Sequence, residues 1–327
     1  MQLDLLMVVG SWYNFVMQDN QTKKIKRVGV LRGGAEKQYA SSLQKGGEVI
    51  SCIFENLGDK YKTFDILVDK DYVWHLNGVP INPGDLSSKV DIVWNTSHPS
   101  FSNILESLSI PNVGTGYFSF ALQGSKDLLR DHVKEIGVLV PKSYIIKKAL
   151  GRSPMGEAKE VFEKFAGPWI VKSFTPDSNM ASPVDVLRPR GIHLAKTFPE
   201  LVDAIEDGVN HEKSILVEEF ILGKVASVHS VPNFRGQDIY TFPLGNSYGI
   251  FSAEEKEKIA NLAKKLHKHL GAKHYLKSDF VLSPRGKIYL LQIDGTPDLN
   301  PSSHFGEVCA SVGAKMSHVI EHILEQA

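Results

Sequence analysis

The stretch YLKSDFVLSPRGKIYLLQIDGTPDLNPSS, residues 275–303, carries the clearest pattern in this chain of 327 residues. Two apolar runs flank the turn sequence SPRG, which predicts two antiparallel strands joined as a hairpin. Alternate residues of a strand point to the same face, so Lys277 shares a face with Asp279, and Gln292 shares one with Asp294. The hairpin therefore presents oxygen donors and one ammonium group to a common site.

Oxygen donors of this kind are the ligands that Mg²⁺ takes when nucleotide phosphates complete its coordination. The residues alone leave an alternative open, in which the same polar side chains line the solvent-facing side of a half-exposed hairpin. The spacing does not decide between a metal site and a solvated face.

The first third of the chain has the pattern of an α/β domain. The apolar run RVGVL begins just after Lys26, two glycines end it, and apolar positions at helical spacing follow. A second apolar run, VDIVW at residues 90–94, precedes another helical stretch and a further short strand. This alternation predicts a parallel sheet in a domain that ends near Gln123.

The remainder has the pattern of an α+β structure. A helix is predicted to start at Ser125 as its N-cap, and a longer one is predicted over residues 253–270, where Ser252 and Glu255 have the spacing of a capping box. The expected organisation is an N-terminal extension at 1–25, a first domain at 26–123, a second at 124–213 and a third at 214–327.

Composition limits the partners and the compartment. Lys+Arg and Asp+Glu both total 37, so no broad basic surface is expected for a nucleic acid or an anionic membrane. The only two cysteines, Cys52 and Cys309, have no metal-ligand spacing, which indicates a reducing compartment and hence the cytoplasm. The apolar first 17 residues carry Asp4 where a signal peptide has a basic residue and are too short to span a bilayer, so we expect a non-native extension.

Other segments fall in a definite order before the hairpin. They are LRGGAEKQYASSL at 31–43, SKDLLRDHVKEIGVLVPKSY at 125–144, GPWIVKS at 167–173 and ILVEEFILGK at 215–224. Together with the hairpin and its final serine pair, this series resembles the D-alanine:D-alanine ligase family of the ATP-grasp superfamily, from about residue 26 to the C-terminus. The resemblance implies an ATP-grasp fold preceded by a Rossmann-like parallel-sheet N-terminal domain.

The resemblance also implies an activity, with ATP and Mg²⁺ (or Mn²⁺) as cofactors. A carboxylate attacks ATP to give an acyl phosphate, and an amine then displaces phosphate to form a dipeptide for peptidoglycan synthesis. Small amino acids are the implied substrates, and a homodimer through the first domain is the implied assembly.

Site residues follow from the same resemblance. Those expected at the nucleotide are Lys126 and Lys172 at the phosphates, Glu218 beside the adenine, and Glu219, Phe220 and Ile221 lining the adenine pocket with their backbone. Those expected at the reaction centre are the metal ligands Asp279, Gln292 and Asp294, then Lys277 for the tetrahedral transition state, Ser303 for the second substrate's carboxylate, and Gln38 for the first substrate's ammonium. Without the resemblance, isolated lysines or an acidic pair at a strand end are more often solvated surface charges.

Several matched positions depart from the family pattern. Gln292 replaces a glutamate and Asp294 replaces an asparagine, so the formal charge of the ligand set is unchanged and magnesium binding is predicted to survive. Asp298 replaces a glycine near the oxyanion, Lys277 replaces an arginine, and the segment SFTPDSNMASPVDV lacks the glycines of a phosphate-binding loop. Two hypotheses stay open: an active ligase, and a paralogue without turnover that binds a nucleotide or a partner.

Overall fold

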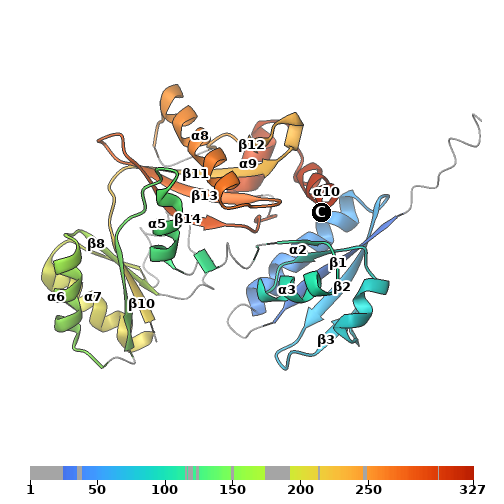
Figure 1. Cartoon of the computed structure of the whole chain (residues 1–327), viewed down its shortest axis with the longest axis horizontal. Coiled ribbons are helices and arrows are strands. Elements are labelled where there is room, and N and C mark those ends of the chain that lie inside the picture. Colours follow the sequence, from blue (N-terminus) through green and yellow to red (C-terminus); the bar gives the residue numbers. More distant parts are fainter. Residues whose placement is uncertain are drawn as a thin grey trace, which may run out of the picture.

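The computed structural model describes residues 25–34, 39–114, 116, 121–122, 125–148, 151–173, 192–212, 214–245, 249–300 and 302–327. Over these ranges the chain forms three sheets, each with its own helices, and Figure 1 shows them as three bodies. The expectations for the N-terminal extension, for Gln38 and for most of the segment SFTPDSNMASPVDV lie outside the described residues. The mixed α/β and α+β class predicted from the sequence is confirmed.

The first sheet is mainly parallel, as the alternating pattern predicted. Its strand order is β4-β3-β2-β1-β5-β6, in which β1 pairs with β2 and β5 in parallel and β5 pairs with β6 in parallel, while β3 and β4 add an antiparallel edge. The strands are β1 (Lys26–Gly33), β2 (Tyr61–Val68), β3 (Trp74–Leu76), β4 (Val79–Pro80), β5 (Ile92–Asn95) and β6 (Asn112–Val113). The helices of this part are α2 (Tyr39–Asn56), α3 (Ser100–Ser107) and the 3₁₀ helix η1 (Pro83–Ser88).

The second sheet is antiparallel and has the order β7-β10-β8-β9. Its strands are β7 (Ser143–Lys147), β8 (Trp169–Ser173), β9 (Ile192–Ala195) and β10 (Ser214–Glu219), and its helices are α6 (Pro154–Lys164) and α7 (Phe198–His211). Leu201 and Ile205 of α7 pack with Val171 and Ile215 in one buried cluster. The helices thus cover one face of the sheet, as Figure 1 shows.

The third sheet is antiparallel, in the order β12-β11-β13-β14. Its strands are β11 (Lys224–Pro232), β12 (Ile239–Thr241), β13 (Leu276–Leu282) and β14 (Ile288–Asp294), and the 3₁₀ helix η4 (Phe234–Gly236) joins the first two. The helices that follow or interrupt it are α8 (Ala253–His269), α9 (His304–Ser311) and α10 (Met316–Gln326). The predicted capping box is present: Ser252 accepts from the Glu255 backbone, and the Glu255 side chain accepts from the Ser252 backbone.

Helix α5 (Lys126–Lys134) packs on this third sheet. Ser125 caps it by accepting a hydrogen bond from the Leu128 N–H, as the sequence predicted. Leu129 and Val133 lie in the same buried cluster as Phe280 of β13. The apolar face of α5 therefore fixes its first residue, Lys126, close to the hairpin.

A separate buried cluster joins the two ends of the described chain. Val28 of β1 and Ile53 of α2 pack in the same cluster as Phe305 of α9 and Ile320 of α10. Figure 1 shows α10 beside α2. The first sheet is therefore covered in part by the last helix.

The described residues contain no helix long and apolar enough to cross a membrane.

Candidate functional site

The hairpin pairs its polar residues across the two strands. In the antiparallel ladder of β13 and β14, Lys277 lies opposite Asp294 and Asp279 lies opposite Gln292. Opposed residues of an antiparallel pair project to the same face. The register thus brings together the four side chains that alternation had placed on one face of each strand.

The carboxylate of Asp279 is fully buried, with 0 % of the residue exposed. Ser227 Oγ donates a hydrogen bond to Oδ1 at 2.5 Å, and Gln292 Nε2 donates one to Oδ2 at 2.5 Å. The ammonium of Lys277 lies 3.4 Å from Oδ2. A buried anion of this kind is stable only when its oxygens are paired, and here the protein itself supplies the donors.

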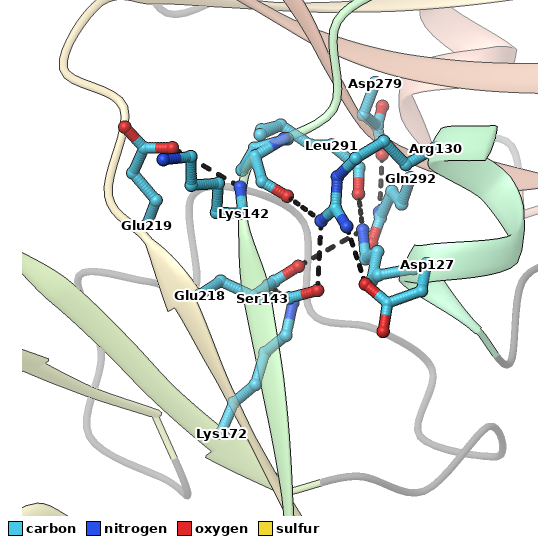
Figure 2. Close-up of polar contacts among 12 residues, drawn as sticks. Asp127, Arg130, Lys142, Ser143, Lys172, Glu218, Glu219, Asp279, Leu291 and Gln292 are labelled. Carbon is cyan, nitrogen blue, oxygen red and sulfur yellow. Dashed lines mark hydrogen bonds and ion pairs between the residues drawn. The ribbon is translucent and has the colours of Figure 1, made fainter. Parts of the chain in front are cut away.

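Glu218, at the end of β10, holds both lysines that were predicted to meet the phosphates. Lys126 Nζ lies 3.4 Å from Oε1, and Lys172 Nζ forms an ion pair with Oε2. Figure 2 shows Lys172, from β8, reaching up to Glu218. The three side chains come from two strands and a helix start, and each is at most 15 % exposed.

Opposing effects set the protonation of this trio. Burial alone would raise the pKa of Glu218, but the positive charges of Lys126 and Lys172 outweigh it and lower that pKa from 4.5 to about 2. Burial lowers the pKa of Lys126, and Glu218 opposes that change. The carboxylate is therefore ionised at neutral pH and balances the lysines.

Lys126 also links the second sheet to the third. Its ammonium donates a hydrogen bond to the backbone carbonyl of Leu291, the residue before Gln292. Figure 2 shows Leu291 and Gln292 above Glu218. The phosphate-binding candidates and the hairpin therefore form one connected site.

Arg130, one turn further along α5, connects this helix to the second sheet. It donates to Asp127 Oδ1 at 2.6 Å and to the carbonyl of Pro141 at 2.6 Å, and its contact with Ser143 Oγ measures 3.2 Å. Ser143 begins β7, which pairs with Glu218 in the sheet. Figure 2 shows the guanidinium of Arg130 between these groups.

The residues expected around the adenine follow directly after Glu218. The N–H of Glu219 donates to the Lys142 carbonyl, and that of Phe220 donates to the Pro168 carbonyl, both at 2.9 Å. Ile221 is half-buried at the crossing from the second sheet to the third. The segment is thus anchored by neighbours on both sides.

Ser303 is the N-cap of helix α9. Its hydroxyl donates to the Asp298 carbonyl at 3.0 Å and accepts from the Gly306 N–H at 3.2 Å. A helix start carries partial positive charge, which suits a carboxylate ligand. The hydroxyl proton of Ser303 is thus used within the protein, and its binding of the second substrate's carboxylate stays a prediction.

The three expected metal ligands fit a magnesium ion chemically. Asp279 and Asp294 supply carboxylates and Gln292 supplies an amide oxygen, all of them hard donors. In the structure the Gln292 amide turns its NH₂ group toward Asp279, so an ion would require the amide to rotate and offer its oxygen. The described residues contain no cluster of three or more His, Cys, Asp and Glu that could hold a metal, since this trio includes only two acids.

The sequence interpretation missed two polar residues of β11, Ser227 and His229. Ser227 pairs with Asp279 and His229 pairs with Lys277 in the ladder between β11 and β13. The signal was available, because both interrupt the apolar strand KVASVHSVP two residues apart. On a strand this spacing places them on the same face.

Comparison with known proteins finds similarity to D-alanine–D-alanine ligases. The family model described as D-ala D-ala ligase C-terminus matches residues 248–325, which include the hairpin. D-alanine–D-alanine ligase of Geotalea uraniireducens is 23% identical over 329 residues, covering 93% of this chain and 96% of that protein. The corresponding ligase of Flavobacterium psychrophilum is 24% identical, over 90% of this chain and 95% of that protein.

Over nearly its whole length, this chain is similar to D-alanine–D-alanine ligases, from which it differs at most sequence positions. Among solved structures, the VanG D-Ala:D-Ser ligase of Enterococcus faecalis superposes with a TM-score of 0.71 at 20% identity, covering 93% of this chain and 99% of that chain. D-alanine–D-alanine ligase of Bacillus anthracis complexed with ATP gives a TM-score of 0.67 at 19% identity, covering 92% and 96%. The ligase family's ATP-grasp fold thus extends over nearly the whole chain.

Proposed function

We propose that this protein is an ATP-dependent ligase that joins two small amino acids, as D-alanine–D-alanine ligases do, through an acyl phosphate. The carboxylate oxygen of the first amino acid attacks the γ-phosphorus of ATP, and ADP leaves. The amine of the second amino acid then attacks the acyl carbon, loses a proton, and phosphate leaves. The product is a dipeptide, for which a role in peptidoglycan precursor synthesis is proposed.

One observation carries the proposal: Lys126 contacts Glu218 of the second sheet and the Leu291 carbonyl of the third. It therefore lies between the proposed nucleotide site and the hairpin. Phosphoryl and acyl transfer concentrate negative charge, so they need fixed positive groups at one place. Lys126, Lys172 and Lys277 are proposed to supply these groups.

Each lysine has its own role in this proposal. Lys126 and Lys172 exchange Glu218 for phosphate oxygens when ATP binds, because a phosphate is the stronger competitor for two ammonium groups. Lys277 stabilises the oxyanion of the tetrahedral intermediate. Ser303, at the start of α9, binds the carboxylate of the second amino acid, and Gln38 is proposed to bind the ammonium of the first.

Asp279, Gln292 and Asp294 are proposed to hold magnesium. Bound there, the ion would neutralise the phosphate oxygens of the nucleotide. The backbone of Glu219, Phe220 and Ile221 is proposed to line the adenine pocket. The proposed location is the cytoplasm, since the free thiols of Cys52 and Cys309 suit a reducing compartment.

A second candidate is a nucleotide-binding paralogue without turnover. The observation in its favour is that the protein's own donors occupy both oxygens of Asp279, which leaves the carboxylate satisfied without an ion. Asp298 also places an acid in the segment before Ser303, where an oxyanion is proposed to form. Both features would weaken catalysis more than nucleotide binding.

Phosphate release separates the two candidates. Purified protein is incubated with ATP, magnesium and D-alanine, and a Lys172→Ala variant serves as the control. Release that depends on D-alanine and exceeds the control supports the ligase. If release equals the control while ATP with magnesium still raises the melting temperature, the ligase is excluded and the binding protein remains.

A further inference from the structure

Behind the proposed reaction centre, a chain of hydrogen bonds connects β13, β11 and α9. Tyr275 Oη lies 2.5 Å from His229 Nδ1, and His229 Nε2 lies 2.8 Å from His304 Nδ1. His304 Nε2 in turn lies 3.1 Å from the carbonyl oxygen of Leu244. The four groups therefore form one continuous line.

The line has a definite direction when both histidine rings are neutral. The Leu244 carbonyl can only accept, so His304 Nε2 carries a proton and its Nδ1 accepts. His229 must then donate from Nε2 and accept at Nδ1, where the Tyr275 hydroxyl donates. Every member is thus satisfied with one proton per ring.

The surroundings of His229 keep it neutral. Its residue is 2 % exposed, and burial lowers its pKa well below the usual value, with further lowering by His304 and Lys277. Burial also raises the pKa of Tyr275 well above its usual value, which keeps the hydroxyl protonated. The rings of His229 and His304 are stacked, with centroids 5.0 Å apart and planes at 28°.

Gly245 gives independent support for the fixed place of His304. Its φ of +59° lies in the left-handed region, and a Cβ built there would lie 2.7 Å from His304 Nε2. The same Cβ would lie 2.6 Å from Val308 of α9. The backbone after Leu244 therefore approaches α9 so closely that only glycine fits.

The two histidines in the middle of this line are neighbours of two residues of the proposed mechanism. His229 is the direct ladder partner of Lys277, and His304 directly follows Ser303. Lys277 and Ser303 themselves come from different elements, a strand and a helix cap. The hydrogen bond between the two histidines is thus a direct link between the element that holds Ser303 and the sheet that carries Lys277.

We infer that His229 and His304 are positioning residues, which hold the binding group for the second amino acid, Ser303, in register with Lys277. This inference rests on the proposed function for its catalytic meaning. The histidines touch no substrate and act through their neighbours. Because the amine of the second amino acid must approach the acyl carbon in one orientation, a shift of α9 should weaken the binding of that amino acid first.

Three variants of His304 test its two ring hydrogen bonds, to His229 and to Leu244, one at a time and together. His304→Leu removes both, His304→Asn can keep an acceptor for His229 Nε2, and His304→Gln can keep a donor to Leu244. We expect His304→Leu to raise the KM for the second amino acid by on the order of tenfold to a hundredfold. The KM for ATP should be unchanged, and His304→Asn should recover most of the loss. His318→Leu, on the exposed face of α10, is the matched control and should behave as the unaltered protein.

Two kinetic outcomes would overturn the inference. One is an unchanged KM for the second amino acid in His304→Leu. The other is an equal rise of that KM in His304→Leu and His304→Asn, which would show that His304 acts through packing and not through its hydrogen bond to His229.

A second measurement does not depend on turnover. Nitrogen-15 NMR of the unaltered protein distinguishes the two neutral tautomers of each histidine, and both His229 and His304 should carry their proton on Nε2. A proton on Nδ1 of either ring contradicts the hydrogen-bond chain. If the unaltered protein releases no phosphate, the proposed function fails and the catalytic role falls with it, while the NMR result still decides the chain.

Discussion

Gln292 Nε2 donates a hydrogen bond to Asp279 Oδ2 at 2.5 Å across the ladder of β13 and β14. A side chain proposed as a metal ligand thus serves as a hydrogen-bond donor to its neighbour. The amide offers its NH₂ to the carboxylate in the place where a cation would offer positive charge. This arrangement stabilises a buried acid without an ion.

The first prediction concerns Gln292→Glu. The change replaces the donor by a second carboxylate, so a half-buried acid faces the fully buried Asp279. Without divalent cations the free energy of unfolding should fall by about 1–3 kcal/mol, and magnesium should restore part of it. Urea denaturation with EDTA and with magnesium measures both effects. The double variant Gln292→Glu/Asp294→Asn restores the formal charge of the unaltered protein. If the loss of unfolding free energy is the same with EDTA and with magnesium in both variants, the second carboxylate does not act through a missing cation.

The second prediction compares the two lysines on Glu218. Lys126→Ala removes an ion pair and the bond to the Leu291 carbonyl, and it leaves the carboxylate with one partner. We expect a loss of about 3–5 kcal/mol in unfolding free energy. Lys172→Ala leaves Lys126 in place and should cost less, about 1–3 kcal/mol. Chemical denaturation of both variants tests the order, and an equal or reversed order would show that Lys126 does not link the two sheets.

The third prediction is the acid response of Glu218. Its pKa in the folded protein is lowered from 4.5 to about 2, so the folded state binds this proton more weakly than the unfolded chain. The stabilisation is complete above pH 4.5 and is lost as the pH falls toward 2. Compared with Glu218→Gln, the unaltered protein should lose stability more steeply across that window. Parallel slopes in the two proteins would exclude the lysine pairing as the cause.

The fourth prediction concerns His267 of α8, which is 1 % exposed. Burial lowers its pKa from 6.5 to about 4, and its Nε2 lies 2.8 Å from the Ala272 carbonyl. The unfolded chain binds this proton more readily, so stability should decrease as the pH falls from 6.5 toward 4, by about 1.4 kcal/mol per pH unit. His267→Gln can keep a donor to Ala272 and should show a shallower decrease in urea midpoint. His274, whose pKa burial also lowers to about 4, and the buried His229 remain in the variant and contribute to the residual slope.

The hairpin could be predicted from the sequence because strand alternation has a period of two. That period alone placed Lys277 with Asp279, and Gln292 with Asp294. Helix α8 was predictable for a similar local reason, since Ser252 and Glu255 cap each other three residues apart. Local rules fixed these features without any knowledge of distant contacts.

Other features depend on contacts that the sequence does not display. Strand β2 was missed because Lys62, Thr63 and Asp65 interrupt its apolar residues, so its sequence YKTFDILV contains neither a long apolar run nor a strict alternation. The bond from Lys126 to the Leu291 carbonyl joins residues 165 positions apart and involves a backbone atom, which carries no residue signature. The orientation of the Gln292 amide was equally hidden, because an amide can donate or accept and only its buried neighbour decides.

The packing of α10 against α2 has a consequence for synthesis. Ile53 and Ile320 share one buried cluster, and Lys60 pairs with Glu321 of the last helix. During synthesis on the ribosome, the first sheet is made before α10, so apolar surface near Ile53 stays exposed until α10 has been made. The apolar surface of α2 is therefore covered only after a segment more than 260 residues later in the chain has been synthesised, although α2 itself is made early.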